Sequence, residues 1–405
     1  MNILHFSTYP HGGAATSCRR LHGALLECGQ FSNLITSADM WGRWPFYAEK
    51  LSFLPYERDR SVRFSFSLAN FGYNLTRHPW VKQADVLHLH WINQGFLSLK
   101  QIRALAALGK PLVWSLHDMW AFTGGCHYSG ACANYRQQCG HCPYLRKPAA
   151  NDLSNQVWQR KSTVLPKNIQ FIAHSNWLAN EARSSSLLRE YTVLSMPTPI
   201  DTRQYQPATE SSIKQFRSEK GIAEEATVLL FAAVKVQEER KGFRYLREAL
   251  NWLKNNRPDC TLEVVVIGNV DQQNLPQLPY PTHVLGMVRD TEQLALIYGS
   301  ADIFAIPSLE DNLPNTVLEA LACGTPVVGF ETGGIPQMVE HQVQGYIAPQ
   351  RDSEQFAAGI HWLAAMPKNE HRQIRQAARS KAETRYSNTV VGSALLAVYN
   401  KLINN

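Results

Sequence analysis

The chain has 405 residues, of which 44% are hydrophobic, and a formal net charge of +7. This length favours two domains, and the composition is that of a globular protein rather than a disordered one. No uninterrupted apolar run reaches the roughly 18 residues that a bilayer-spanning helix needs. The first residues, MNILHFSTYP, predict a strand and not a signal peptide, so we expect a cytoplasmic location and reduced cysteines.

The positive charge is concentrated in the first half of the chain. Residues 1–200 contain 20 Lys and Arg against 10 Asp and Glu, whereas residues 201–405 contain 20 against 23. The basic residues are densest at 41–82, where they alternate with Trp, Phe and Tyr. Such a mixture suits an anionic membrane surface, single-stranded nucleic acid, or a solvated basic face over core aromatics. We expect the inner membrane surface to be the partner, and no nucleic acid.

Short apolar segments alternate with helical stretches along the chain, which is typical of an α/β protein with parallel sheets. The strands predicted in the first half are residues 2–7, 32–36, 85–90, 111–116, 169–173 and 192–195. A proline-rich segment, residues 196–207, then predicts a linker, because a residue that precedes proline disfavours the helical conformation. The strands predicted after it are residues 227–234, 262–267, 283–285, 302–306 and 325–330, and the chain ends in a helix at 388–402.

The segment PSLEDNLPNTVLEALACG, residues 307–324, lies between two of these strands. It predicts a loop and then a helix that begins near Pro314. Free N–H groups at a helix start favour an anion such as a diphosphate, and Glu319 on the helix can accept hydrogen bonds from a ribose diol. The segment therefore predicts a nucleotide pocket at the carboxyl end of a parallel sheet. The alternative is an ordinary strand–helix–strand crossover with solvated acids.

This segment resembles the nucleotide-sugar motif of family 4 glycosyltransferases, retaining enzymes of the GT-B fold with two Rossmann-like domains that face a cleft. The family motif has two Glu separated by seven residues. Here Glu319 stands at the second position, and Asp311, a shorter carboxylate, stands at the first. The resemblance implies that the donor is bound by Asp311, Asn312, Leu313 and Glu319.

The resemblance also implies which part of the chain binds which substrate. Residues 1–196 would bind the acceptor, residues 197–387 the nucleotide sugar, and the last helix, 388–405, would pack back on the first domain. The implied reaction moves a hexose from a nucleotide diphosphate sugar to an oligosaccharide, lipid-linked in surface-polysaccharide assembly. Two alternatives remain open: a GT-B epimerase that acts on a nucleotide sugar, and a zinc-stapled protein that binds nucleic acid.

The sequence contains no Asp-x-Asp motif for a divalent metal, so we expect no catalytic cofactor. The protein must then supply the positive charge that stabilises a departing diphosphate. The segment EERKGFRYL, residues 238–246, resembles the Lys-Gly element of the family, in which Lys241 would meet the diphosphate. Lys235 or Arg240 would be a second cation. The alternative for each is an ordinary charged residue at a helix start.

Two glycine pairs follow predicted strands. Gly12-Gly13 ends the first strand and lets the backbone approach a phosphate, although any tight turn uses such a pair. Gly333-Gly334 resembles the family loop that touches the donor sugar. His117 ends another strand, where the family places a catalytic histidine near the sugar hydroxyls, and the alternative is a structural histidine.

Four of the eight cysteines lie close together in the sequence, at Cys126, Cys132, Cys139 and Cys142. Four thiolates on a loop suit a structural zinc ion, although the first spacing is wider than that of common zinc motifs. Free thiols and two disulfides are the alternatives. The pattern resembles an insert of the exopolysaccharide branch of family 4, which includes transferases of the colanic-acid type.

Overall fold

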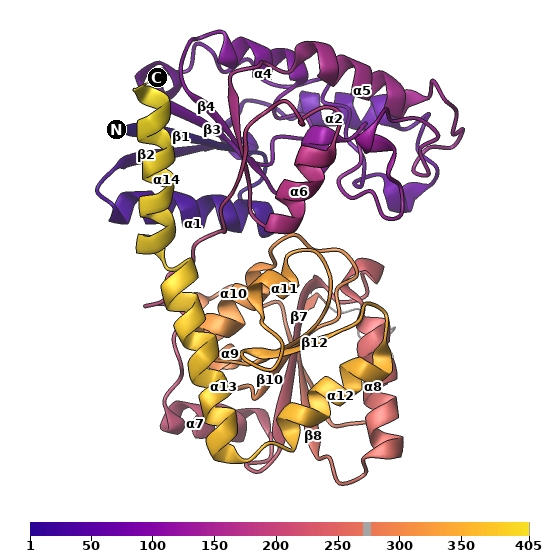
Figure 1. The fold of residues 1–405 in the computed structure, drawn as a ribbon, viewed down its shortest axis with the longest axis vertical. Helices are drawn as coiled ribbons and strands as arrows, with labels where there is room; N and C mark the ends of the chain where they lie inside the picture. Colours follow the sequence, from indigo (N-terminus) through magenta and orange to yellow (C-terminus); the bar gives the residue numbers. More distant parts are fainter. Residues whose placement is uncertain (270–276, 405) are drawn as a thin grey trace. The chain divides into compact units, whose positions relative to one another are not determined.

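The computed structural model describes residues 1–269 and 277–404. Contacts divide the chain into two compact units, shown in Figure 1. Unit 1 comprises Met1–Pro199 and the chain from Val391 onward, and unit 2 comprises Ile200–Val390. The first boundary therefore falls inside the proline-rich segment, and the second falls inside the last helix.

A parallel sheet of six strands forms the centre of unit 1, in the order β2-β1-β3-β4-β5-β6. The strands are β1 Asn2–Ser7, β2 Phe31–Thr36, β3 Val86–Leu89, β4 Leu112–Leu116, β5 Ile169–Ala173 and β6 Val193–Ser195. The helices are α1 Gly13–Glu27, α2 Trp44–Phe53, α3 Pro79–Gln83, α4 Leu99–Ala106, α5 Leu153–Val164, α6 Asn176–Ser184 and α14 Asn388–Ile403. Because β1 pairs with both β2 and β3, the strand order reverses beside β1.

Unit 2 repeats this plan with the order β12-β11-β10-β7-β8-β9. The strands are β7 Thr227–Lys235, β8 Leu262–Asn269, β9 Thr282–Gly286, β10 Ile303–Ile306, β11 Val327–Phe330 and β12 Gly345–Ala348. The helices are α7 Glu210–Lys220, α8 Phe243–Asn256, α9 Thr291–Ser300, α10 Asn315–Ala322, α11 Ile335–Met338, α12 Ser353–Ala364 and α13 Lys368–Lys381. The strand order reverses between β7 and β10, as in a Rossmann fold.

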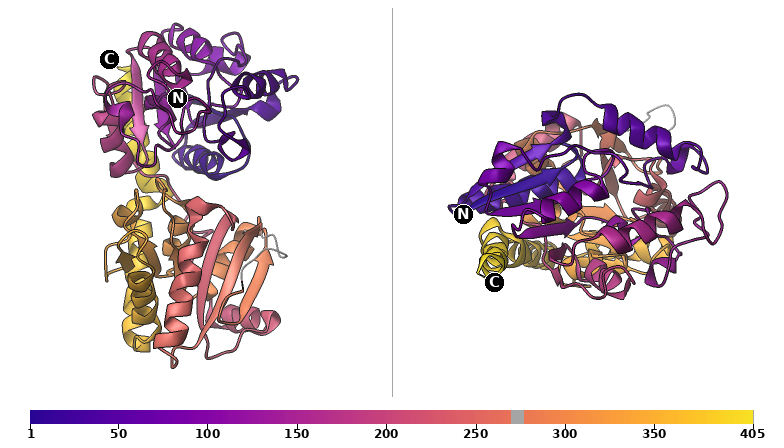
Figure 2. Two further views of the ribbon diagram at one scale, coloured as in Figure 1. Left: turned by 90° about the vertical axis from the view of Figure 1, so that its right-hand side faces the viewer. Right: turned by 90° about the horizontal axis from the view of Figure 1, so that it is seen from above.

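Both faces of the unit 2 sheet are buried, which explains its continuous apolar strands. Along β10, Phe304 and Ile306 belong to one core, and Ile303 and Ala305 belong to the other. Helices α9 and α10 contribute to the first core, and α8 and α12 contribute to the second (Figure 2). The alternation follows from the two-residue period of a strand.

The last helix, α14, packs on unit 1. Its residues Val391, Leu395 and Tyr399 share a buried cluster with Ile3 of β1 and Val86 of β3. The Tyr399 hydroxyl also lies 2.6 Å from Nδ1 of His88. Helix α14 therefore completes the core of unit 1, most of which is formed by the first 199 residues.

The predicted fold class, two Rossmann-like domains with parallel sheets, is confirmed. The sequence analysis missed β12, a four-residue strand at the edge of the sheet with two half-buried residues. The sequence of β12, GYIA, is half-buried and has fewer large apolar residues than the other four-residue strands. None of the helices in residues 1–269 and 277–404 is long and apolar enough to cross a membrane.

Candidate functional site

The point in unit 2 where the strand order reverses brings two loops together. Strands β7 and β10 are neighbours in the sheet, and their carboxyl ends lie at the same edge. The loop after β7 contains a short turn, Glu239–Lys241, and the loop after β10 leads to α10. The backbone N–H of Leu309 donates to the carbonyl of Arg240 at 2.8 Å and joins the two loops. Ligands of open α/β sheets bind at this position.

Lys241 and Asp311 form the central ion pair of these loops. Lys241 Nζ donates to Asp311 Oδ2 at 2.6 Å, and the Ser308 hydroxyl donates to the same oxygen at 3.3 Å. Burial acts to raise the pKa of Asp311, but the charges of Lys241 and Arg240 outweigh it and hold the pKa below its usual value. Asp311 is therefore ionised at neutral pH, and it fixes the ammonium group of Lys241, whose side chain stays 22% exposed.

The two candidates for a second cation differ in their surroundings. The Arg240 guanidinium donates to the Glu310 carbonyl at 2.7 Å, pairs with Glu238 at 3.0 Å and lies 3.8 Å from Asp311. Lys235 is exposed at the end of β7. The structure thus places Arg240, and not Lys235, beside Lys241 and Asp311.

Two glycines allow the backbones of these loops to approach closely. A Cβ on Gly242 would lie 1.8 Å from the Pro307 carbonyl oxygen, and one on Gly333 would lie 1.7 Å from the Asp311 carbonyl oxygen. Both residues have positive φ, 72° and 54°, a backbone conformation that disfavours any residue other than glycine. The loop that carries Gly333 and Gly334 therefore packs directly on the backbone of Asp311. The sequence analysis did not assign Gly242 a role, although it is the glycine of the Lys-Gly element.

Glu319 lies on the second turn of α10 and is 8% exposed. The Tyr298 hydroxyl, on α9, donates to its Oε2 at 2.9 Å. Burial and the neighbouring Glu319 raise the pKa of Tyr298 well above its usual value, so Tyr298 stays a donor. Asn312 and Leu313 are buried in the loop that precedes the helix. The sequence analysis missed Tyr298, because a tyrosine on an apolar helix carries no signal that it faces a carboxylate.

The other predicted donor-binding glycines lie in unit 1. Gly12 precedes α1 with φ of 98°, and a Cβ there would meet no atom within 4 Å. Gly13 is the first residue of that helix. The turn is therefore open. Gly12 is favoured there by its positive φ and not by a close contact inside unit 1.

His117 follows β4, is half-buried and lies beside the buried histidines His90 and His174. Its Nε2 lies 3.1 Å from Nδ1 of His90, and its ring lies 4.7 Å from that of His174. Burial, together with His174, lowers the pKa of His117 well below its usual value. His117 is therefore a neutral imidazole that exchanges one hydrogen bond with His90, a partner that the sequence analysis missed.

The neighbouring Asp118 forms hydrogen bonds with residues other than His117. Its carboxylate accepts from the backbone N–H of Trp120 at 2.9 Å and from the Trp91 indole at 2.8 Å, and it lies 2.7 Å from Nδ1 of His127. Asp118 therefore holds the backbone of the turn that follows it and the Trp91 side chain.

The four cysteines at 126–142 are all free thiols. The ligand atoms of three or more metal-binding side chains gather within 4.8 Å only at His5, Cys18 and His90 among the described residues. No three of these four sulfur atoms therefore lie within 4.8 Å of one another in the described part of the chain, and the zinc site stays a prediction. Hydrogen bonds hold the loop: Asp152 accepts from Cys142 N at 2.8 Å, and Asn155 donates to the Cys139 carbonyl at 2.7 Å. Burial raises the pKa of Cys142 to about 12 and that of Cys139 to about 11, so both are protonated.

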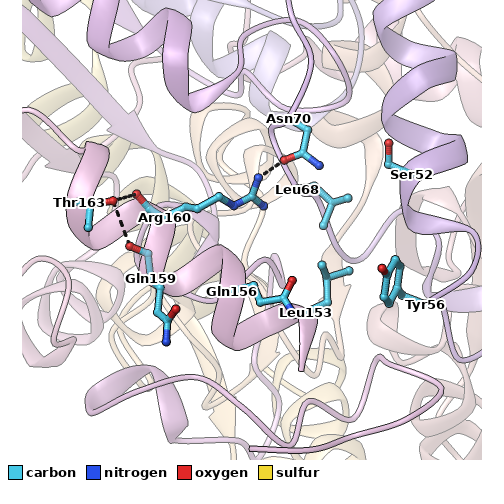
Figure 3. A pocket seen from close by; sticks show the side chains of 9 residues that line it. All are labelled: Ser52, Tyr56, Leu68, Asn70, Leu153, Gln156, Gln159, Arg160 and Thr163. Carbon is cyan, nitrogen blue, oxygen red and sulfur yellow. Dashed lines mark hydrogen bonds between the residues drawn. The ribbon is translucent and has the colours of Figure 1, made fainter. Parts of the chain in front are cut away.

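The basic and aromatic segment forms α2 and its flanks, and much of it is exposed. The exposed large hydrophobic residues of this segment are Trp41, Trp44, Tyr47, Leu51, Leu54, Tyr56, Phe64 and Trp80. Beside it lies a hollow of about 690 Å³ between α2 and α5 (Figure 3). Its polar lining includes Asn70, Gln156, Gln159 and Arg160, and Arg160 donates to the Asn70 side chain. Phe53 and Phe66 of the same segment are buried, so the segment combines exposed aromatic side chains with core ones, and its three alternatives stay open.

Comparison with curated proteins finds relatives of part of the chain. It is 29% identical over 177 residues to D-inositol 3-phosphate glycosyltransferase of Corynebacterium kroppenstedtii, a match that covers 40% of this chain and 38% of that protein. It is 32% identical over 117 residues to the amylovoran biosynthesis glycosyltransferase AmsK of Erwinia amylovora, covering 27% and 28%. Each match spans less than half of the relative.

Solved structures match the whole chain. A glycosyltransferase from Rickettsia africae has a TM-score of 0.69 at 13% identity, covering 100% of this chain and 99% of that one. Anabaena Alr3699/HepE in complex with UDP-glucose has a TM-score of 0.63 at 16% identity, covering 99% and 100%. Residues 226–366 match the family model described as glycosyl transferases group 1. The chain therefore has the GT-B fold of glycosyltransferases, and most of its unit 2 matches the group 1 family.

Proposed function

We propose that the protein is a retaining glycosyltransferase that transfers a hexose from a nucleotide diphosphate sugar to a saccharide. The observation that carries this proposal is the Lys241–Asp311 pair, at the edge of the unit 2 sheet where the strand order reverses. The group 1 match covers this pair, and the structurally similar HepE was solved with UDP-glucose. Measuring the unfolding temperature with UDP and with GDP tests the proposal.

The proposed chemistry rests on charge that develops on the leaving group. As the bond between the sugar and the diphosphate breaks, negative charge grows on the phosphate oxygens, and a fixed cation there lowers the barrier. Lys241 is held for that role by Asp311, and the backbone at Gly333 lies against the same residue. Glu319 accepts from the ribose hydroxyls, with its other partner Tyr298 keeping it in place. No catalytic metal is needed in this scheme.

We further propose that the acceptor is a lipid-linked oligosaccharide of surface-polysaccharide assembly, in the exopolysaccharide branch of family 4. AmsK, which matches part of the chain, is named for the biosynthesis of the polysaccharide amylovoran. The exposed aromatic side chains of α2 and its flanks suit the inner face of the cell membrane, where such acceptors reside. The protein would then be cytoplasmic and bound peripherally to that membrane.

Replacing Trp41 and Trp44 with serine and Arg60 with glutamate should lower binding to anionic vesicles at least about tenfold. Trp41 is 99% exposed and Trp44 is 60% exposed, so both can enter the interface without unfolding the chain. Co-sedimentation with vesicles of phosphatidylglycerol and phosphatidylcholine measures the effect. High salt should release the wild type in part, since the Debye length falls to about 3 Å at 1 M.

The matched control is Phe31→Ser, because Phe31 is 73% exposed but lies at the start of β2. It should bind vesicles like the wild type. Equal binding by the triple variant and the control would contradict the membrane proposal, and single-stranded nucleic acid would then be the partner to test.

A further inference from the structure

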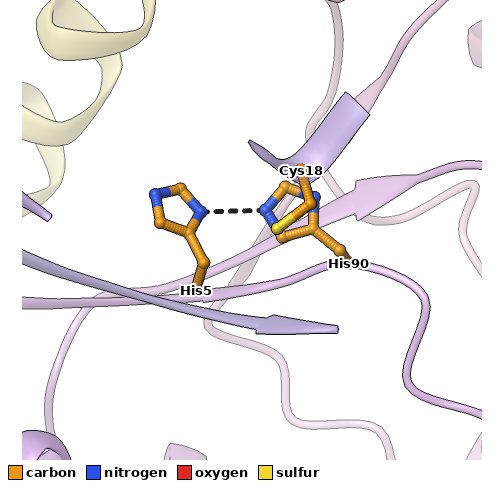
Figure 4. Close-up of side chains that lie close together, drawn as sticks. All are labelled: His5, Cys18 and His90. Carbon is orange, nitrogen blue, oxygen red and sulfur yellow. Dashed lines mark hydrogen bonds between the residues drawn. The ribbon is translucent and has the colours of Figure 1, made fainter. Parts of the chain in front are cut away.

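Three buried side chains of unit 1 form a cluster that the proposed reaction does not use. They are His5 on β1, Cys18 on α1 and His90 just after β3, each at most 1% exposed (Figure 4). One ligand atom of each lies within 4.8 Å of the others, and His5 Nδ1 lies 2.9 Å from His90 Nε2. The side chains come from three separate elements, so the fold itself holds the arrangement.

We propose that His5, Cys18 and His90 form a binding site for one monovalent copper ion. For zinc, metal–nitrogen bonds are about 2.0 Å and metal–sulfur bonds about 2.3 Å, so three ligands spread evenly around one such ion lie about 3.5 to 3.7 Å apart. Each sulfur–nitrogen distance, now within 4.8 Å, therefore needs to shorten by at most about 1.1 Å, and the two nitrogens need to separate by about 0.6 Å. Thiolate and imidazole are ligands that suit both copper and zinc, so the charge of the site decides between them.

The charge of the surroundings favours a monovalent ion over a divalent one. The side chain that interacts electrostatically with His5 is His22, and the one that interacts with Cys18 is Arg19. Neither of these neighbours is acidic. Cu⁺ with one thiolate and two neutral imidazoles is uncharged, whereas Zn²⁺ in the same place would leave a net positive charge. A net charge in a fully buried site is costly.

The protons balance without any further reactant. Before the ion arrives, the site holds the Cys18 thiol and the two imidazoles of His5 and His90, which share a hydrogen bond of 2.9 Å. When Cu⁺ binds, the S–H bond of Cys18 breaks, the sulfur–copper bond forms and one proton goes to solvent. The hydrogen bond between His5 Nδ1 and His90 Nε2 breaks, and each imidazole keeps its one proton on the ring nitrogen that does not bind the ion, so that His90 donates from Nδ1 to His117 at 3.1 Å. Such an outer hydrogen bond is typical of metal-bound histidine.

The test measures how much Cu⁺ the reduced full-length protein withdraws from the coloured chelator bicinchoninate under anaerobic conditions. The wild type should withdraw one more Cu⁺ per chain than Cys18→Ala, with release of one proton. The thiols at 126–142 are present in both proteins, so any binding there cancels in the difference. His5→Gln should show the same loss of one Cu⁺. If thermal unfolding without copper shows that Cys18→Ala is misfolded, His5→Gln takes its place in the comparison.

Cys323→Ala is the matched control, because Cys323 is also 0% exposed but lies in unit 2. It should withdraw as much Cu⁺ as the wild type. Equal withdrawal by Cys18→Ala and Cys323→Ala would overturn the site. Displacement of the bound Cu⁺ by an equal amount of Zn²⁺ would overturn the assignment of a monovalent ion.

Discussion

Replacing Lys241 with alanine is expected to lower kcat by a factor of about 100 to 1,000, the usual loss when one fixed stabiliser of a developing charge is removed. The KM for the donor should change less, because the diphosphate gains charge only as the bond to the sugar breaks. Asp311 would lose its closest cation, so its pKa should rise toward the value that burial favours. Initial rates of nucleotide diphosphate release measure both constants.

Two variants separate the charge of Lys241 from its bulk. Lys241→Arg keeps the charge beside Asp311 and should recover part of the rate, whereas Lys235→Ala, at an exposed position, should leave the rate nearly unchanged. A chelator of divalent metals should not stop turnover in a short assay. Prompt loss of activity that Mg²⁺ or Mn²⁺ restores would show that a metal, and not Lys241, neutralises the leaving group.

Replacing Glu319 with glutamine should raise the Kd for the nucleotide diphosphate by about 10- to 100-fold. A hydrogen bond to a charged group contributes about 1.5–3 kcal/mol, and glutamine keeps the size of the side chain while it loses the charge. The glutamine oxygen can still accept from Tyr298, so the buried pair should survive. Calorimetric titration of both proteins with the nucleotide diphosphate measures the change.

The control for Glu319 is Glu354→Gln, an exposed carboxylate in the first turn of α12. This variant should bind like the wild type. If Glu319→Gln also binds like the wild type, then Glu319 serves only the packing of Tyr298, and the ribose contact must be sought elsewhere.

The strands could be predicted because strands buried on both faces are continuous apolar runs. β1 and β5 begin and end at the residues predicted, and among the strands in residues 1–269 and 277–404 the one missed is β12, half-buried and at an edge. Glycines also carried information, since Gly333 has both positive φ and a backbone neighbour that excludes a side chain. Apolar runs and glycine pairs are features of the local sequence, so they can be recognised in a single chain.

Contacts between distant side chains could not be predicted in the same way. Lys241 and Asp311 were each singled out, but nothing in a separation of 70 residues says that they form an ion pair. The bond of Tyr298 to Glu319 and that of His90 to His117 were missed for the same reason. The cysteine spacing suggested zinc, yet the distances between thiols depend on the path of the loop, which spacing does not fix.

The unfolding temperature of the full chain with UDP, GDP and UDP-glucose tests most directly whether unit 2 binds a nucleotide diphosphate sugar. A ligand at about 100 times its Kd stabilises the folded state by about 2.7 kcal/mol, which raises the midpoint measurably. The account predicts that one nucleotide and its sugar raise the midpoint of the wild type, and that Glu319→Gln needs a higher concentration for the same rise. No rise with any nucleotide diphosphate or its sugars, at millimolar concentration, would contradict it.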